Sequence, residues 1–110
     1  LRHGLLTLRL PKRKKGVEYM TSFVFGARNI PAALYKTLGG FATNGINMVK
    51  IESYLMPGRF QAAEFYCEVE GHPEDKGLHQ ALEELAYFGR DISILGTYEK
   101  NNFRNKLNRG

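Results

Sequence analysis

The sequence predicts an α+β domain in which two helices cover one face of a four-stranded antiparallel sheet. Three observations lead to this fold class. Segments rich in β-forming residues and segments with helical periodicity follow one another in the order strand, helix, strand, strand, helix, strand. The length of 110 residues suits one domain. A content of 43% hydrophobic and 25% charged residues is that of an ordinary globular chain.

The first strand is expected at residues 21–26, where Phe23 and Phe25 share one face. The first helix is expected to begin at Asn29, because asparagine is a favoured N-cap residue. Pro31 suits the first turn, since its missing N–H would have no partner there.

The apolar residues of this helix recur at i, i+4, i+7 and i+8, which predicts one buried stripe. Glycine at position 45 supplies the left-handed residue that ends a helix. The pair Gly39-Gly40 costs about 1 kcal/mol per residue relative to alanine, which suggests close packing against the sheet or a neighbour. The stripe comprises Leu34, Leu38, Phe41 and Ala42.

The second and third strands are expected at 46–56 and 60–70, joined by a turn at Pro57-Gly58. In the second strand we expect Val49 and Ile51 on one face, and Met48 and Lys50 on the other. The third strand alternates cleanly, which is typical of an antiparallel sheet with one covered face. Its covered residues are Phe65, Cys67 and Val69, and its opposite residues are Glu64, Tyr66, Glu68 and Glu70.

A loop over residues 71–75 leads into the second helix, which Gly89 ends. A fourth strand follows, with Ile92, Ile94 and Tyr98 in alternation. The helical stripe comprises Leu78, Ala81, Leu82, Leu85 and Phe88. The complete order is the ferredoxin-like βαββαβ arrangement.

The positive charge is concentrated at the two ends of the chain. Residues 1–16 hold six Lys or Arg and no acid, and residues 100–110 hold four and no acid. Residues 17–99 hold six bases and eleven acids. We therefore expect a basic linker or the end of a preceding domain at 1–18, a folded domain at 19–99 and a basic flexible tail at 100–110.

The basic run at 12–15 is interpreted as a solvated linker, with a nucleic-acid or localisation patch as the alternative. The apolar residues 5–10 precede the basic cluster, the reverse of a secretion signal, so we expect none. They suit either the last strand of a preceding domain or an unrelated segment. The start without Met suggests a piece of a longer protein. No apolar run is long enough for a membrane span.

The sequence contains no pattern for catalysis or for a metal site. One cysteine, Cys67, excludes an internal disulfide, and its covered register indicates a structural thiol. His3, His72 and His79 match no metal motif. Adjacent Glu83 and Glu84 diverge by about 100° on a helix. We therefore expect no metal and no cofactor.

Two segments suggest binding. The first is the start of the first helix, where free N–H groups and the positive helix end suit a carboxylate, and small residues let a ligand approach. A well-capped helix start is its structural alternative. The second is 47–54, where charged and hydroxyl side chains interrupt a strand. A solvated edge strand is the alternative there. The candidate residues are Asn29, Pro31, Ala32, Ala33, Leu34, Asn47, Glu52, Ser53 and Tyr54.

These segments resemble the ACT regulatory domain at the C-terminus of prephenate dehydratase, over about residues 19–98. The family's helix entry reads Asn-x-Pro-Gly-Ala-Leu, matched here at 29–34 with Ala32 in place of glycine. Its second strand reads Gly-Ile-Asn and then Lys-Ile-Glu-Ser-Arg-Pro. Here 45–47 and 50–53 match, and Tyr54-Leu55 replaces Arg-Pro. The likeness continues at Phe65-Tyr66, at 70–72, at 81–85 and at 95–98.

The resemblance implies a cytoplasmic domain that forms a homodimer and binds L-phenylalanine at the subunit boundary. Asn29 and the N–H groups near Ala32–Leu34 would hold the head group, Leu34 the ring, and the partner's Glu52 and Ser53 would close the pocket. The effector would inhibit a catalytic dehydratase domain of the same protein, as feedback on phenylalanine biosynthesis. The family's Thr-Arg-Phe catalytic motif is absent from this sequence, so the chain itself lacks the catalytic residues.

Two other functions share this element order. One is a standalone ACT amino-acid sensor. The other is an RNA-binding ferredoxin-like domain, which presents basic and aromatic residues on strand three. Glu64, Glu68 and Glu70 on that strand would repel phosphate, so we expect no nucleic-acid partner.

Overall fold

The computed structural model describes residues 11–55 and 62–100. Its elements are β1 (Tyr19–Arg28), α1 (Ile30–Thr43), β2 (Met48–Leu55), β3 (Ala62–Glu70), α2 (Lys76–Leu85) and β4 (Arg90–Glu99). The expected turn at 57–58, the apolar residues 5–10 and the tail after residue 100 lie outside the described residues. None of the described helices has the length and apolar character needed to cross a membrane.

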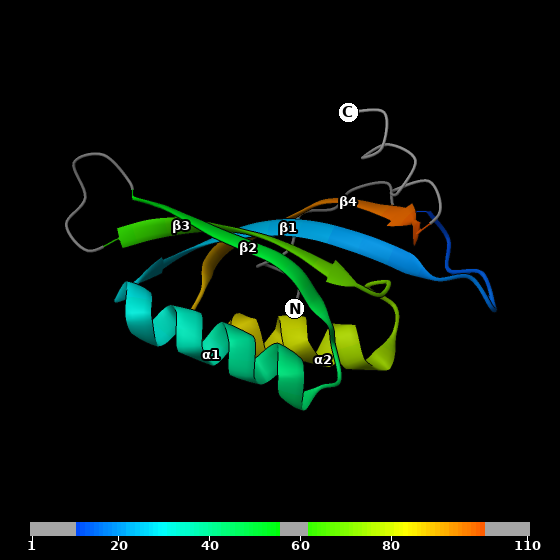
Figure 1. The fold of residues 1–110 in the computed structure, drawn as a ribbon, viewed down its shortest axis with the longest axis horizontal. Coiled ribbons are helices and arrows are strands. Elements are labelled where there is room, and N and C mark those ends of the chain that lie inside the picture. The colour runs from blue at the N-terminus through cyan, green and yellow to red at the C-terminus, as the bar shows by residue number, and fades with distance from the viewer. Residues whose placement is uncertain (1–10, 56–61, 101–110) are drawn as a thin grey trace.

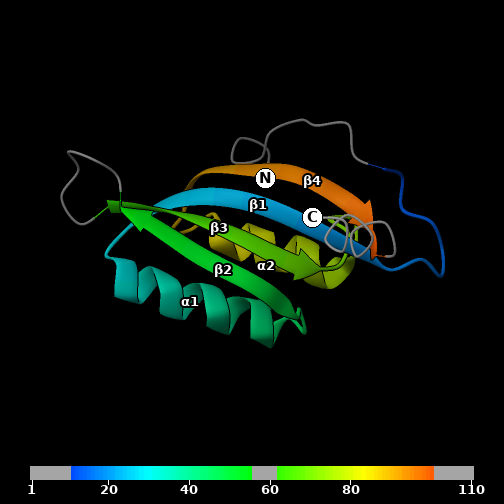
Figure 2. The same ribbon diagram turned by 45° about the horizontal axis from the view of Figure 1, so that its top comes forward.

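The four strands form one antiparallel sheet in the order β2-β3-β1-β4, and both helices lie against the same face (Figures 1 and 2). The predicted ferredoxin-like fold is therefore confirmed. Strands β2 and β4 are the two edges of the sheet. The opposite face carries acidic side chains from β3, because the alternation of that strand places Glu64, Glu68 and Glu70 there.

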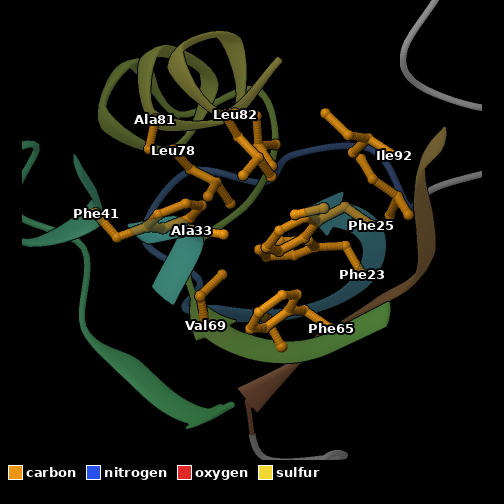
Figure 3. Close-up of a cluster of buried hydrophobic side chains, with 14 of the residues drawn as sticks. Phe23, Phe25, Ala33, Phe41, Phe65, Val69, Leu78, Ala81, Leu82 and Ile92 are labelled. Atoms are coloured by element: carbon orange, nitrogen blue, oxygen red, sulfur yellow. The ribbon is translucent and has the colours of Figure 1, made fainter. Parts of the chain in front are cut away.

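Stacked phenylalanine rings form the centre of the core (Figure 3). The Phe25 and Phe65 rings lie 5.0 Å apart, and Phe23 lies 5.6 Å from Phe41 of α1. Leu82 of α2 is also fully buried against this cluster. Each such side chain contributes about 1.5–3 kcal/mol on burial, so this stack holds the helix layer to the sheet.

Helix α1 buries a different stripe from the one predicted. Ala33, Thr37 and Phe41 are buried, whereas Leu34 and Leu38 are exposed, as is Ala42. The Thr37 hydroxyl donates to the Ala33 carbonyl, so a polar residue is accommodated in the core. The helix has apolar residues on two flanks, and the periodicity alone assigned the wrong one to the core.

Strand β2 contains an irregularity that the alternation did not reveal. Met48 pairs with Val69 and Lys50 with Glu68, so Val49 is an extra residue between them. Met48 and Ile51 therefore both pack against the core, and Val49 is exposed. The prediction that Val49 shares the face of Ile51 was wrong for this reason.

The end of α1 matches the expected glycine-assisted ending. Gly45 has φ 75°, and its N–H donates to the Ala42 carbonyl. Helix α2 begins beside this point, and a Cβ at Gly77 would lie 2.8 Å from the Asn44 carbonyl oxygen. The two helices can approach here only because residue 77 is glycine.

A polar cluster attaches the segment before β1 to the loop before α2. The Arg13 guanidinium pairs with Asp75 at 2.7 Å. The backbone N–H of Glu74 donates to Nδ1 of the buried His72, so the ring proton is on Nε2 and is donated to the Pro11 carbonyl. Partial burial raises the pKa of Asp75, but hydrogen bonds from His72 N–H and Arg13 outweigh it and lower the pKa overall.

We predict that Gly77→Ala destabilises the domain by about 1–3 kcal/mol, because the added methyl group meets a backbone oxygen that cannot move cheaply. Gly39→Ala is the matched control. A Cβ at Gly39 has nothing within 4 Å, so this change should stabilise by up to about 1 kcal/mol. Urea denaturation measures both, and equal effects of the two substitutions would contradict the close helix approach.

Candidate functional site

The start of α1 has an unusual backbone. Asn29 has φ 49° and Asp91, at the start of β4, has φ 52°, both in the left-handed region that non-glycine residues rarely adopt. Asn29 occupies the N-cap position, but its side chain makes no capping hydrogen bond, contrary to the expected cap. Its left-handed backbone accounts for this, since a capping residue normally has extended dihedral angles. Backbone strain of this kind gathers at binding and catalytic sites.

A polar cavity of about 220 Å³ opens beside this helix start. Asn29, Ala32 and Ala33, three of the residues proposed from the sequence, line it, and Phe88 lies on its α2 side. Three cationic side chains also line this cavity: Arg28, Lys36 and Arg90. The sequence analysis missed this group because its members come from three different elements. The Lys36 ammonium lies 5.8 Å from the centre of the Phe88 ring. Among described residues, none of the three cations forms a salt bridge.

The second predicted segment lies on the edge strand β2. The Tyr54 hydroxyl donates to the Glu52 carboxylate, and Lys50 pairs with Glu52 at 3.5 Å. The Tyr54 hydrogen bond lowers the pKa of Glu52, with a smaller contribution from Lys50, so this carboxylate is ionised at neutral pH. Because Ile51 packs on the core, Glu52 and Tyr54 occupy the opposite face and Ser53 shares the face of Ile51.

The start of α1 and the end of β2 lie at the same end of the domain in both views (Figures 1 and 2). Within one protomer, however, Glu52 and Tyr54 occupy the sheet face that the helices do not cover. Asn47 lies past the far end of α1, about 20 Å from Asn29 by the rise of the helix. The structure therefore places Asn29, Ala32 and Ala33 around one cavity, with Pro31 and Leu34 outside its lining. Glu52–Tyr54 lie together near the end of β2. Within one chain these two groups do not enclose a ligand.

An apolar edge, formed by Leu34 and Leu38 of α1 with Val49, Tyr54 and Leu55 of β2, is exposed. Lys36 and Gly40 face α2, where they meet Phe88 and Glu84. Leu38 is two residues from each of them, so it lies about 160° around the helix, although it also borders the hollow that α1 forms with Leu85 and Phe88. More large apolar side chains are exposed on this flank of α1 and on β2 than on the other edge strand, β4, where Leu95 and Tyr98 are exposed.

The chemistry of the remaining groups is structural. No group of three metal-ligating side chains forms within residues 11–55 and 62–100. Cys67 is buried as predicted, and burial raises the pKa of its thiol to about 12. On the sheet face away from the helices, burial and a hydrogen bond to Glu68 raise the pKa of Tyr66 to about 12.

We predict that Cys67 in the folded protein resists thiol reagents at pH 8, because its pKa leaves almost no thiolate and its side chain is buried. Labelling with a chromogenic disulfide should follow global unfolding in urea. A Cys67→Ala, Leu95→Cys double variant provides an exposed control thiol that reacts at once. Labelling of folded wild-type protein at the control rate would contradict the buried position.

No family model matches the chain. Comparison with known proteins nevertheless finds several with similar sequences. A bifunctional N-acyl-homoserine lactone acylase/prephenate dehydratase from Komagataeibacter europaeus is 48% identical over 83% of this chain and 32% of its own length. A bifunctional chorismate mutase/prephenate dehydratase from Aquifex aeolicus is 40% identical over 73% of this chain and 22% of its own. The chain thus spans less than a third of these relatives.

Solved structures show the same likeness. GqqA, described as a novel type of quorum quenching acylase, aligns with a TM-score of 0.77 at 46% identity, over 92% of this chain and 51% of its own. Prephenate dehydratase from Arthrobacter aurescens, solved in complex with L-Phe, aligns with a TM-score of 0.74 at 28% identity. That alignment covers 87% of this chain and 31% of the other.

Proposed function

Because this chain belongs to the family of ACT regulatory domains carried at the C-terminus of prephenate dehydratases, we propose that it binds L-phenylalanine between two copies of itself. The observation that carries the proposal is the start of α1, where Asn29 and Ala32 lie at the same end of the domain as the end of β2, the segment that contains Glu52 and Ser53. The L-Phe complex of the Arthrobacter relative supports this choice of ligand.

The two halves of the seat come from different protomers. Asn29 and the N–H group of Ala32 receive the carboxylate, because the first N–H groups of a helix lack intrahelical partners. The Ala33 N–H, also expected to take part, already donates to the Asn29 carbonyl. Leu34, exposed on the flank beside β2, provides apolar contact for the ring. The ionised Glu52 of the opposing copy attracts the ammonium group, and its Ser53 closes the pocket.

The apolar edge supplies the surface through which the two copies meet. An edge strand presents unpaired N–H and C=O groups, and here it is flanked by exposed apolar side chains from α1. The two copies meet through this edge in a twofold interface, in which each surface meets its own copy, with the α1 start of one copy beside the β2 end of the other.

Such a ligand acts on the equilibrium between quaternary states. A molecule that contacts two chains binds the assembled state better than the separated one, and shifts the population by that difference in affinity. In the parent protein, a cytoplasmic enzyme with a dehydratase domain, this shift is the feedback signal that lowers catalytic activity. A standalone amino-acid sensor would use the same seat without that partner domain.

We predict that L-phenylalanine raises the melting temperature of the 110-residue protein and binds in calorimetry. Asn29→Ala and Glu52→Ala should each weaken binding about five- to a hundredfold, as expected for lost hydrogen bonds to charged groups. Glu64→Ala is the control, since Glu64 is an exposed carboxylate on β3 outside the seat. Unchanged binding in both seat variants, or no response at millimolar ligand, would refute the assignment.

We also predict that Val49→Glu dissociates the dimer, because it places an unpaired charge on the apolar edge through which the two copies meet, at a cost of several kcal/mol. Leu95→Glu is the matched control. Both residues lie at irregularities of edge strands, with exposed fractions of 52% for Val49 and 50% for Leu95. Sedimentation velocity should show monomers only for Val49→Glu, and a dimer that persists in this variant would place the interface elsewhere.

A further inference from the structure

The outer surface of the helix layer contains a groove that the proposed function does not use. It lies between α1 and α2 and encloses about 590 Å³, a volume typical of small-molecule sites. Its wall is largely apolar, with Tyr35 and Phe41 from α1 and Leu85 from α2, followed by Phe88. Tyr35 is 79% exposed, so described residues leave this wall uncovered.

Two glycines keep this groove open. A Cβ at Gly39 would meet no atom within 4 Å, and one at Gly40 would lie 3.5 Å from the Glu84 carboxylate. The glycine pair was expected to pack closely against the sheet or a neighbour, and no described residue packs closely against Gly39. Each glycine costs the helix about 1 kcal/mol, and at Gly39 no contact with a described residue compensates this cost.

The groove has opposite charges at its two ends. It is continuous with the polar cavity at the start of α1, because Lys36 and Phe88 line both. Arg28, Lys36 and Arg90 thus gather at one end. At the other end the Glu84 carboxylate accepts hydrogen bonds from Asn44 and Gln80. A ligand with one anionic head and an apolar body would place its head at the cationic end.

We propose that this groove binds a small organic acid in which a carboxylate is joined to an aryl or alkyl body. The carboxylate pairs with Lys36 and the two arginines, which hold no salt bridge with other described residues. The body lies along Gly39-Gly40 between Tyr35 and Phe88. The ligand body lies on the α2 flank of α1, whereas Leu34 and β2 are on the other flank, and Leu38 borders the groove. The carboxylate end adjoins the proposed L-phenylalanine seat, because Asn29 and Ala32 line the same cavity. The two sites therefore differ in where the apolar body of the ligand lies.

The test uses 3-phenylpropionate and octanoate as aryl and alkyl probes, with 3-phenylpropionamide and octanamide as uncharged controls. Binding to the 110-residue protein is followed by backbone amide NMR shifts and by calorimetry. We expect at least one acid to bind, to shift the amides of Lys36, Gly39 and Gly40, and to bind at least tenfold more tightly than its amide. Absence of binding by both acids at 10 mM, or equal affinity of acid and amide, overturns the proposal.

Substitutions separate this site from the effector seat. Gly39→Leu fills the groove and should abolish acid binding, whereas Gly39→Ala should retain it, and Lys36→Gln should weaken it at least tenfold. L-phenylalanine binding should persist in Gly39→Leu, and acid binding should persist in Glu52→Ala. Acid binding that survives Gly39→Leu overturns the proposal. So does a Gly39→Leu protein that changes its assembly state, because the groove would then be an interface between copies.

Discussion

The stack of phenylalanine rings between sheet and helices is the constraint from which the other features follow. Phe23, Phe25 and Phe65 present flat rings on one sheet face, and α1 meets them with the single large residue Phe41. The small side chains of Ala33 and Thr37 let the helix approach this surface. The leucines of α1 are consequently turned outward, which creates the apolar edge beside β2.

The sequence predicted the order of elements because each had a strong local signal. The clean alternation of β3 assigned every residue of 64–70 to the correct face. The faces of β2 were mispredicted because one inserted residue, Val49, reverses the alternation, and a bulge has no signature in apolar pattern alone. The α1 stripe was mispredicted because the helix carries apolar residues on two flanks, only one of which the sheet covers.

The candidate site shows a similar division. Asn29–Leu34 and Glu52–Tyr54 could be proposed from the sequence because they are continuous segments with characteristic residues. The cationic group of Arg28, Lys36 and Arg90 was not, because its members are far apart in the sequence and only the pairing of β1 with β4 and the packing of α1 unite them. Whether a chain closes its own site is also invisible in sequence, since it depends on which sheet face Glu52 occupies.

Helix α1 connects the proposed effector seat to the opposite end of the domain. Its start forms the seat, and its last turn contacts α2 at Gly77 and through the hydrogen bond from Asn44 to Glu84. A helix of 14 residues moves as a rigid body, so a ligand that repositions its start also displaces its end. The loop before α2 adjoins that end and holds the segment that precedes β1 through His72 and Asp75. Ligand binding between two copies would therefore act on the segment through which an N-terminal catalytic domain would be attached. A displacement of α1 would reach α2 directly, because Gly77 allows the two helices to be in contact at the end of α1.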